Sequence, residues 1–119
     1  ATVHAAREQG GLSTRPLGAH LAEAMGDGLA VIGFTAAGGA SSMAGMPSQP
    51  FEAAPPGSLE AQATAGGEPL VYLDASALRS LGEVPSRLLG RFTASDWSAS
   101  FDGVVVVREE TPPVFEAWQ

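Results

Sequence analysis

The sequence contains no cysteine, no lysine and no asparagine among its 119 residues. Without cysteine, the chain can form no disulfide and has no thiolate for catalysis or metal binding. All six basic residues are arginines, which are scattered along the chain instead of forming a basic stripe, and the net charge is −7. We therefore expect no nucleic-acid partner.

No apolar run approaches the length of a membrane span, and no signal peptide is visible. We therefore expect no membrane partner and a cytoplasmic location. Apolar residues make up 45% of the chain and charged residues 16%, which indicates a folded protein instead of a disordered one. The length predicts a single domain over residues 1–119.

Three continuous apolar runs, at residues 29–34, 69–74 and 101–107, indicate buried strands. They are short and apolar throughout, as in the interior strands of a sheet that is covered on both faces. Helix-forming segments alternate with these runs, at residues 13–25, 58–65, 75–81 and 85–89. The alternation predicts a small three-layer α/β fold, in which helices cover one mainly parallel sheet of three or more strands. We expect all three apolar runs to belong to that sheet.

Residues 35–57 have a different composition, rich in glycine, alanine, serine and proline, with Met43 and Met46 among their few large apolar side chains. A loop of this length in a compact domain is usually functional. We expect Phe34, at the end of the first strand, to line a substrate pocket together with the two methionines. Trp97 either forms a wall of that pocket or fills the core.

Three ionisable residues are candidates for chemistry. His4 can take a proton from water near pH 7, unless it is a residue without a role at a frayed chain end. Asp74 ends a predicted strand, where it either faces the ligand crevice beside the base or caps the following helix. His20 lies beside the apolar stripe of its helix and either lines the pocket or is partly buried with a hydrogen-bond partner. No His, Asp or Glu spacing indicates a metal site, and we expect none.

Three stretches resemble, in this order, parts of the erythromycin esterase family. They are LGAHL to VIGF (17–34), PPGSLE to LVYLD (55–74) and FDGVV (101–105). The resemblance implies the carboxyl-terminal part of that family's fold and a structural role for Asp102, an acid that must be paired or at an edge in so apolar a strand. Family members are several times longer than this chain.

The resemblance also implies a reaction. Many family members hydrolyse the lactone ester of macrolide antibiotics without a metal, using histidine as the general base that activates water. His4 resembles the second histidine of the family's His-Asn-x-His motif, whereas Ala1 and Thr2 stand in place of the first histidine and the asparagine. With this departure, His4 is the one motif histidine that the chain carries.

The function implied is that of a small-molecule enzyme in natural-product metabolism, without a cofactor, acting on a bulky apolar, polyketide- or macrolide-like substrate. The reaction is either hydrolysis of an ester or lactone assisted by His4, or a cyclisation or rearrangement in a shaped pocket. The alternatives are a non-catalytic ligand-binding or accessory domain, and one part of a larger esterase-like assembly. An enzyme should place His4 or His20 in a closed pocket beside a carboxylate, whereas a part of an assembly should expose a flat apolar face.

Because the family's sheet is larger than three strands, we expect this chain to leave a strand edge and an apolar face open. Such surfaces are seldom left in water, so we predict a homodimer that buries at least about 1,200 Å². Trp97, Phe115 and Trp118 are the expected anchors of the interface. The competing outcome is a monomer in which residues 112–119 fold back over the open edge.

Overall fold

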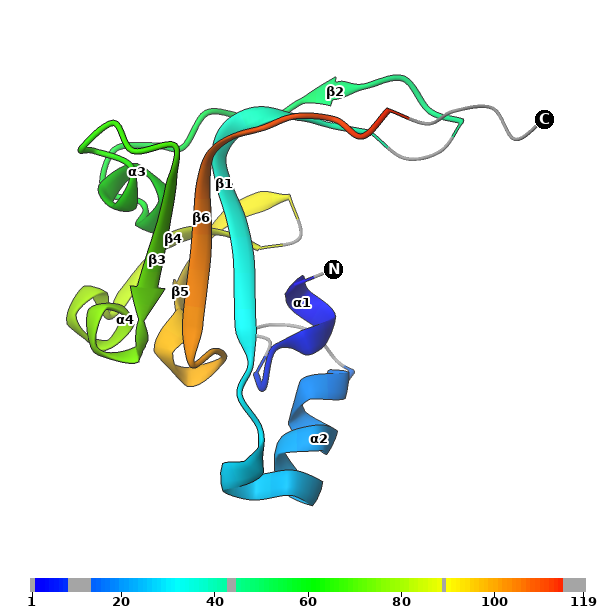
Figure 1. Cartoon of the computed structure of the whole chain (residues 1–119), viewed down its shortest axis with the longest axis vertical. Coiled ribbons are helices and arrows are strands. Elements are labelled where there is room, and N and C mark those ends of the chain that lie inside the picture. Colours follow the sequence, from blue (N-terminus) through cyan, green and yellow to red (C-terminus); the bar gives the residue numbers. More distant parts are fainter. Residues whose placement is uncertain (1, 9–13, 43–44, 89, 115–119) are drawn as a thin grey trace.

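The computed structural model describes residues 2–8, 14–42, 45–88 and 90–114. It is a mixed α/β fold built on a four-stranded sheet with the strand order β2–β1–β6–β3 (Figure 1). The four strands are β1 (Ile32–Ser41), β2 (Gln49–Pro50), β3 (Leu70–Asp74) and β6 (Gly103–Glu110). A separate antiparallel hairpin is formed by β4 (Glu83–Leu88) and β5 (Arg91–Asp96).

The helices are short. They are α1 (Thr2–Ala5), α2 (Leu17–Met25), α3 (Leu59–Ala63) and α4 (Ala75–Leu81), with 3-10 turns η1 (Gly26–Gly28) and η2 (Trp97–Ala99). Side-chain oxygens mark where two of them begin, because Ser58 accepts from the Ala61 amide and Asp74 from the Ala77 amide. In the described ranges, none of the helices has the length and apolar character needed to cross a membrane.

The three apolar runs of the sequence do belong to one sheet, as predicted. The first strand is longer than expected, since β1 begins at Ile32 and continues to Ser41, into the segment predicted as a loop. Its parallel pairing with β6 extends as far as Gly39 opposite Glu110, so backbone hydrogen bonding continues where the side-chain pattern gives no strand signal.

The prediction of a mainly parallel sheet is not confirmed. β1 and β6 are parallel, but β3 is antiparallel to β6 and β2 is antiparallel to β1. A helix between two strands allows a parallel crossover without requiring one. Here α4 has only seven residues, about 10 Å, and the chain returns through the hairpin to the end of the sheet that it left, since Asp74 pairs with Gly103.

The predicted helix at residues 85–89 was wrong, because this segment lies largely in strand β4. Gly90, which looked like the stop of a helix, has φ +77° and follows the strand at the hairpin turn. Contacts with other elements favour the strand: Arg87 donates its backbone N–H to the buried Glu60 carboxylate of α3. Leu89 lies outside the described residues.

The core lies between one face of the sheet and the layer formed by α3, α4 and the hairpin. Its largest buried apolar side chains are Leu59, Leu78, Trp97, Phe101, Val104 and Val106. The rings of Trp97 and Phe101 pack with centroids 5.0 Å apart and an interplanar angle of 41°. Gly33 of β1 faces this cluster, where a Cβ would lie 3.2 Å from the Phe101 ring.

Candidate functional site

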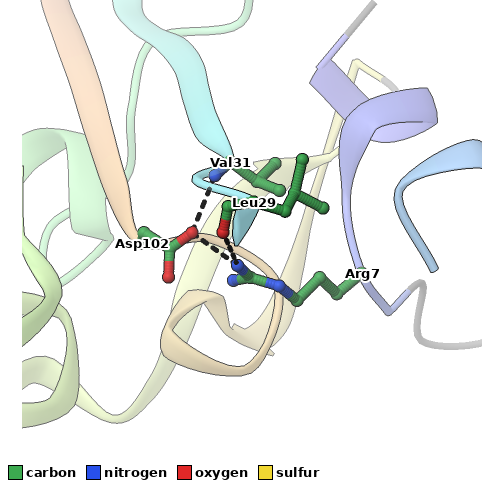
Figure 2. Close-up of polar contacts among 4 residues, drawn as sticks. All are labelled: Arg7, Leu29, Val31 and Asp102. Atoms are coloured by element: carbon green, nitrogen blue, oxygen red, sulfur yellow. Dashed lines mark hydrogen bonds and ion pairs between the residues drawn. The ribbon is translucent and has the colours of Figure 1, made fainter. Parts of the chain in front are cut away.

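Asp102 joins the amino ends of the parallel strands β1 and β6 through the Val31 amide, and it also forms an ion pair with Arg7 (Figure 2). Asp102 stands immediately before β6, and its Oδ2 accepts from Arg7 Nη2 at 2.5 Å and from the Val31 amide at 2.7 Å. Arg7 Nη2 also donates to the Leu29 carbonyl at 3.2 Å. The contact fixes the segment after α1 to the start of both strands, and it confirms that Asp102 is paired.

The hydrogen bond from Arg7 lowers the pKa of Asp102 below its ordinary value of 3.8. Partial burial opposes this effect, and the Val31 amide adds to it. Because the pKa is lower in the folded state than in the unfolded state, the ion pair stabilises the fold at pH values above about 4. That contribution disappears as the pH falls through the folded-state pKa.

Arg7→Ala is expected to lower the free energy of unfolding by about 1–2 kcal/mol at pH 7. This loss is smaller than the loss of a fully buried charged hydrogen bond would be, because the side chains of Arg7 and Asp102 are 24% and 43% exposed. Urea denaturation at pH 7 and at pH 2 checks this, since the loss should shrink at the lower pH. Arg15→Ala is the matched control: its ion pair with Glu23 is 52% and 68% exposed, so it should cost almost nothing. An equal loss at both pH values would contradict the account.

The ionisable residues predicted for catalysis lie at separate places. His4 on α1 and His20 on α2 are both exposed. Asp74 accepts from the Ala77 amide at 2.8 Å and so takes the capping role that was its alternative. Since β3 is antiparallel to β6, Asp74 lies beside Gly103 at the amino ends of β6 and β1, not at their carboxyl ends. Within the described ranges no hydrogen bond joins His4 to Asp74, and β6 separates β3 from β1.

Among the described residues, the side chains predicted to bind substrate lie on different parts of the fold. Trp97 is 3% exposed and belongs to the core, whereas Phe34 is 61% exposed on the opposite face of the sheet. Met46 is 57% exposed in the segment before β2. Met43 lies outside the described residues, as do the two carboxyl-terminal aromatic residues predicted as interface anchors.

The face of the sheet opposite the core carries a row of apolar side chains across three strands. This outer sheet face consists of Ile32, Phe34, Leu70, Tyr72, Val105 and Val107. Tyr72, Val105 and Phe34 stand in register, and Tyr72 and Leu70 are 54% and 56% exposed. The Tyr72 ring lies over Gly103, where a Cβ would collide with it. Ile32, Phe34, Leu70 and Tyr72 are 37–61% exposed, so much of this apolar row faces solvent. Ala36, which stands opposite Val107 on the same face, is buried.

A buried carboxylate holds α3 against the strands. Glu60 is fully buried, and its Oε1 accepts from Thr35 Oγ1 at 2.8 Å and from the Arg87 amide at 2.7 Å. Its Oε2 has no partner within the described residues. Sequence reasoning missed Glu60, because an acid in the first turn of a helix is usually an exposed residue that favours the helix amino terminus.

Arg87, also missed, fixes the segment that follows β2. Its guanidinium lies 4.8 Å from the centroid of the Phe51 ring and 4.4 Å from that of the Phe92 ring. It donates to the carbonyl oxygens of Ala36, at 3.3 Å, and of Glu52. Only 9% of Arg87 is exposed. These contacts order part of the segment predicted as a long loop.

A cavity of about 200 Å³ opens beside the hairpin and η2. It is lined by Glu8, Glu83, Ala94, Ser95, Asp96, Trp97, Ala99, Ser100 and Phe101. This lining contains no histidine, so the cavity does not provide the closed site beside a base that we expected of an enzyme. Across the described ranges, no group of three or more His, Asp or Glu side chains is placed to hold a metal ion.

Comparison with known proteins shows the family of the chain and proteins of similar fold. The family model described as erythromycin esterase matches residues 2–110. A succinoglycan biosynthesis protein superposes with a TM-score of 0.76 at 16% sequence identity, over 92% of this chain and 32% of that protein. A mutant of the erythromycin esterase EreC, in its open conformation, superposes with a TM-score of 0.64 at 20% identity, over 91% of this chain and 30% of that protein. The chain thus spans about a third of the length of each neighbour, and no curated protein matches it significantly.

Proposed function

Because the chain belongs to the erythromycin esterase family, we propose that it acts as a hydrolase on an ester or lactone of a bulky, mostly apolar small molecule, such as a macrolide. His4 is the proposed general base, taking a proton from the water that attacks the carbonyl carbon. Its exposure on α1 leaves the imidazole accessible to water and substrate. The Arg7–Asp102 ion pair supports the role, because it anchors the segment next to α1 to the sheet.

The match to the family model carries the proposed reaction, and the outer sheet face carries the proposal for how the site is completed. The cavity beside the hairpin has no histidine in its lining, so the proposed site that uses His4 lies outside this cavity and takes a wall from another surface. An apolar row across three strands is a surface on which such a wall can pack. For the 119-residue chain we propose that a second copy supplies it, in a homodimer whose two outer sheet faces meet.

Static light scattering tests the association. We expect a mass near twice 12.1 kDa that falls toward 12.1 kDa on dilution. The double variant Leu70→Glu/Tyr72→Glu should be monomeric throughout, because four added carboxylates would face one another in the dimer and lose their water. Val114→Glu is the control, since Val114 is 91% exposed and lies beyond the end of β6 at Glu110, and it should associate like the unaltered chain.

Two results would count against the homodimer. A mass of 12.1 kDa at every concentration would favour the alternative of one part in a larger esterase-like assembly, which fits the share of each neighbour that the chain spans. A dimer that persists in the double variant would move the interface away from the outer sheet face.

A further inference from the structure

Residues 2–8, here called the α1 arm, carry His4 and are joined to the rest of the fold through a small contact. The helix α1 has four residues, and a single helical turn is not stable by itself. The apolar part of the contact is also small, because Ala6 is the arm residue in the buried core cluster and its side chain is one methyl group. The position of the arm therefore depends mainly on its polar contacts.

These polar contacts gather at two neighbouring residues at the end of the arm. The Arg7 backbone N–H donates to the Ser100 carbonyl at 3.1 Å, and Ser100 Oγ donates to the Glu8 carbonyl at 2.9 Å. The Arg7 guanidinium adds the ion pair with Asp102 and the hydrogen bond to the Leu29 carbonyl (Figure 2). Together they form a latch between the arm and the amino ends of β1 and β6.

The sheet does not depend on this latch. The strands β1 and β6 pair through their own backbones, and Asp102 accepts from the Val31 amide in a bond that does not involve the arm. On its other side the arm rests on α2 at Gly18, where a Cβ would lie 1.8 Å from the Ala5 carbonyl oxygen. This is a contact of backbone with backbone, which buries no large side chain of the arm. The arm can therefore leave while the sheet stays paired.

We propose that the α1 arm docks and undocks as a unit, and that the latch thereby controls whether His4 is in place for catalysis. Within the described ranges no hydrogen bond or ion pair holds the exposed His4 side chain, so the imidazole is placed by the arm alone. Arg7 and Asp102 are then positioning residues, which act on the reaction through the arm. The catalytic part rests on the proposed hydrolase, whereas the docking of the arm does not.

Amide hydrogen exchange followed by NMR tests the docking. The Arg7 amide, which is bonded to Ser100, reports on the arm, and the amide of the buried Val104 in β6 reports on the sheet. We expect the Arg7 amide to be protected about 100-fold less, with an exchange rate that changes little in urea, because undocking exposes little surface. Arg7→Ala should lower the protection at position 7 a further 5- to 30-fold or about that. Equal protection of the two amides, with equal dependence on urea, would mean that the arm leaves only when the whole fold unfolds, and would overturn the proposal.

The hydrolysis of erythromycin tests the positioning, at a temperature at which circular dichroism shows each variant to be folded. Arg7→Ala should lower kcat at least about tenfold and leave KM within about twofold, because an undocked arm removes His4 without removing the surface that binds substrate. Arg7→Lys keeps a cation beside Asp102 and should recover part of the rate. Arg15→Ala is the matched control, since its exposed ion pair with Glu23 lies outside the arm, and its kcat should not change.

The two measurements separate the two claims. An unchanged kcat in the folded Arg7→Ala variant would overturn the positioning role of the latch. If the unaltered chain does not hydrolyse erythromycin, the proposed hydrolase and the catalytic role of the arm fail together. The exchange rates of the Arg7 and Val104 amides would still decide whether the arm docks as a separate unit.

Discussion

Replacing Glu60 with alanine is expected to lower the free energy of unfolding by about 2–4 kcal/mol. The carboxylate is fully buried and accepts from both Thr35 Oγ1 and the Arg87 amide. Alanine would leave the two donors unpaired at a fully buried position. The lost hydrogen bond joins β4 to α3, so both elements are destabilised. A loss of free energy of this size should lower the melting temperature by on the order of 10 °C. Urea denaturation and calorimetry measure both quantities.

Glu60→Gln is the matched variant. It keeps an amide oxygen at the position of Oε1, so both donors retain an acceptor, and it removes a buried charge whose Oε2 has no partner in the described residues. We expect a change of less than about 1 kcal/mol. If alanine and glutamine prove equally destabilising, the charge itself stabilises the fold and the account of the two hydrogen bonds is wrong.

The sequence predicts the strands of this fold better than their directions. The apolar runs that become β1, β3 and β6 were enough to predict that all three belong to one sheet. The ends of α4 were also predictable, since Asp74 is its N-cap and Gly82 its C-cap. The direction of a strand depends on the path of the chain that leads to it. Here the path between β3 and β6 runs through the hairpin, which is held to α3 by the hydrogen bond from the Arg87 amide to Glu60. The two residues are 27 positions apart, so no local sequence pattern predicts this bond.

The sequence also predicts apolar faces without indicating whether they are covered. Leu17, Leu21 and Met25 have helical spacing and do form one stripe of α2, but the three side chains are 38–61% exposed. The helix instead packs on the end of α1 through Gly18, where no Cβ would fit. In the same way, the continuous apolar run of β6 predicts cover on both faces, yet its outer neighbours Tyr72 and Leu70 are exposed.

The sequence was sufficient to predict the family of the protein, but only some of the contacts at the candidate site. The ordered stretches that resemble the erythromycin esterases extend over most of the residues that the family model matches. The pairing of Asp102 followed from its place in an apolar strand, whereas Arg7 as its partner did not, because the two residues are 95 positions apart. The roles of His4 and His20 stay predictions, since no contact in the structure defines them.

The largest effect is expected for His4. His4→Ala should lower the rate of ester or lactone hydrolysis about 100- to 10,000-fold, the usual cost of losing a general base. Because His4 is exposed on α1, the melting temperature should stay the same. His20→Ala removes the other imidazole and should change kcat by less than about twofold, since water activation does not use it. Equal losses in both variants would remove His4 from its proposed role.

The most direct test of the account is the hydrolysis of erythromycin per chain, followed by mass spectrometry, at concentrations below and above the association midpoint found by light scattering. If the outer sheet face of a second copy completes the site, the rate per chain should rise with the dimeric fraction. It should be lost in His4→Ala and in Leu70→Glu/Tyr72→Glu, and retained in Val114→Glu. Product formation no faster than the uncatalysed reaction at every concentration, while the chain is dimeric, would contradict the proposed hydrolase.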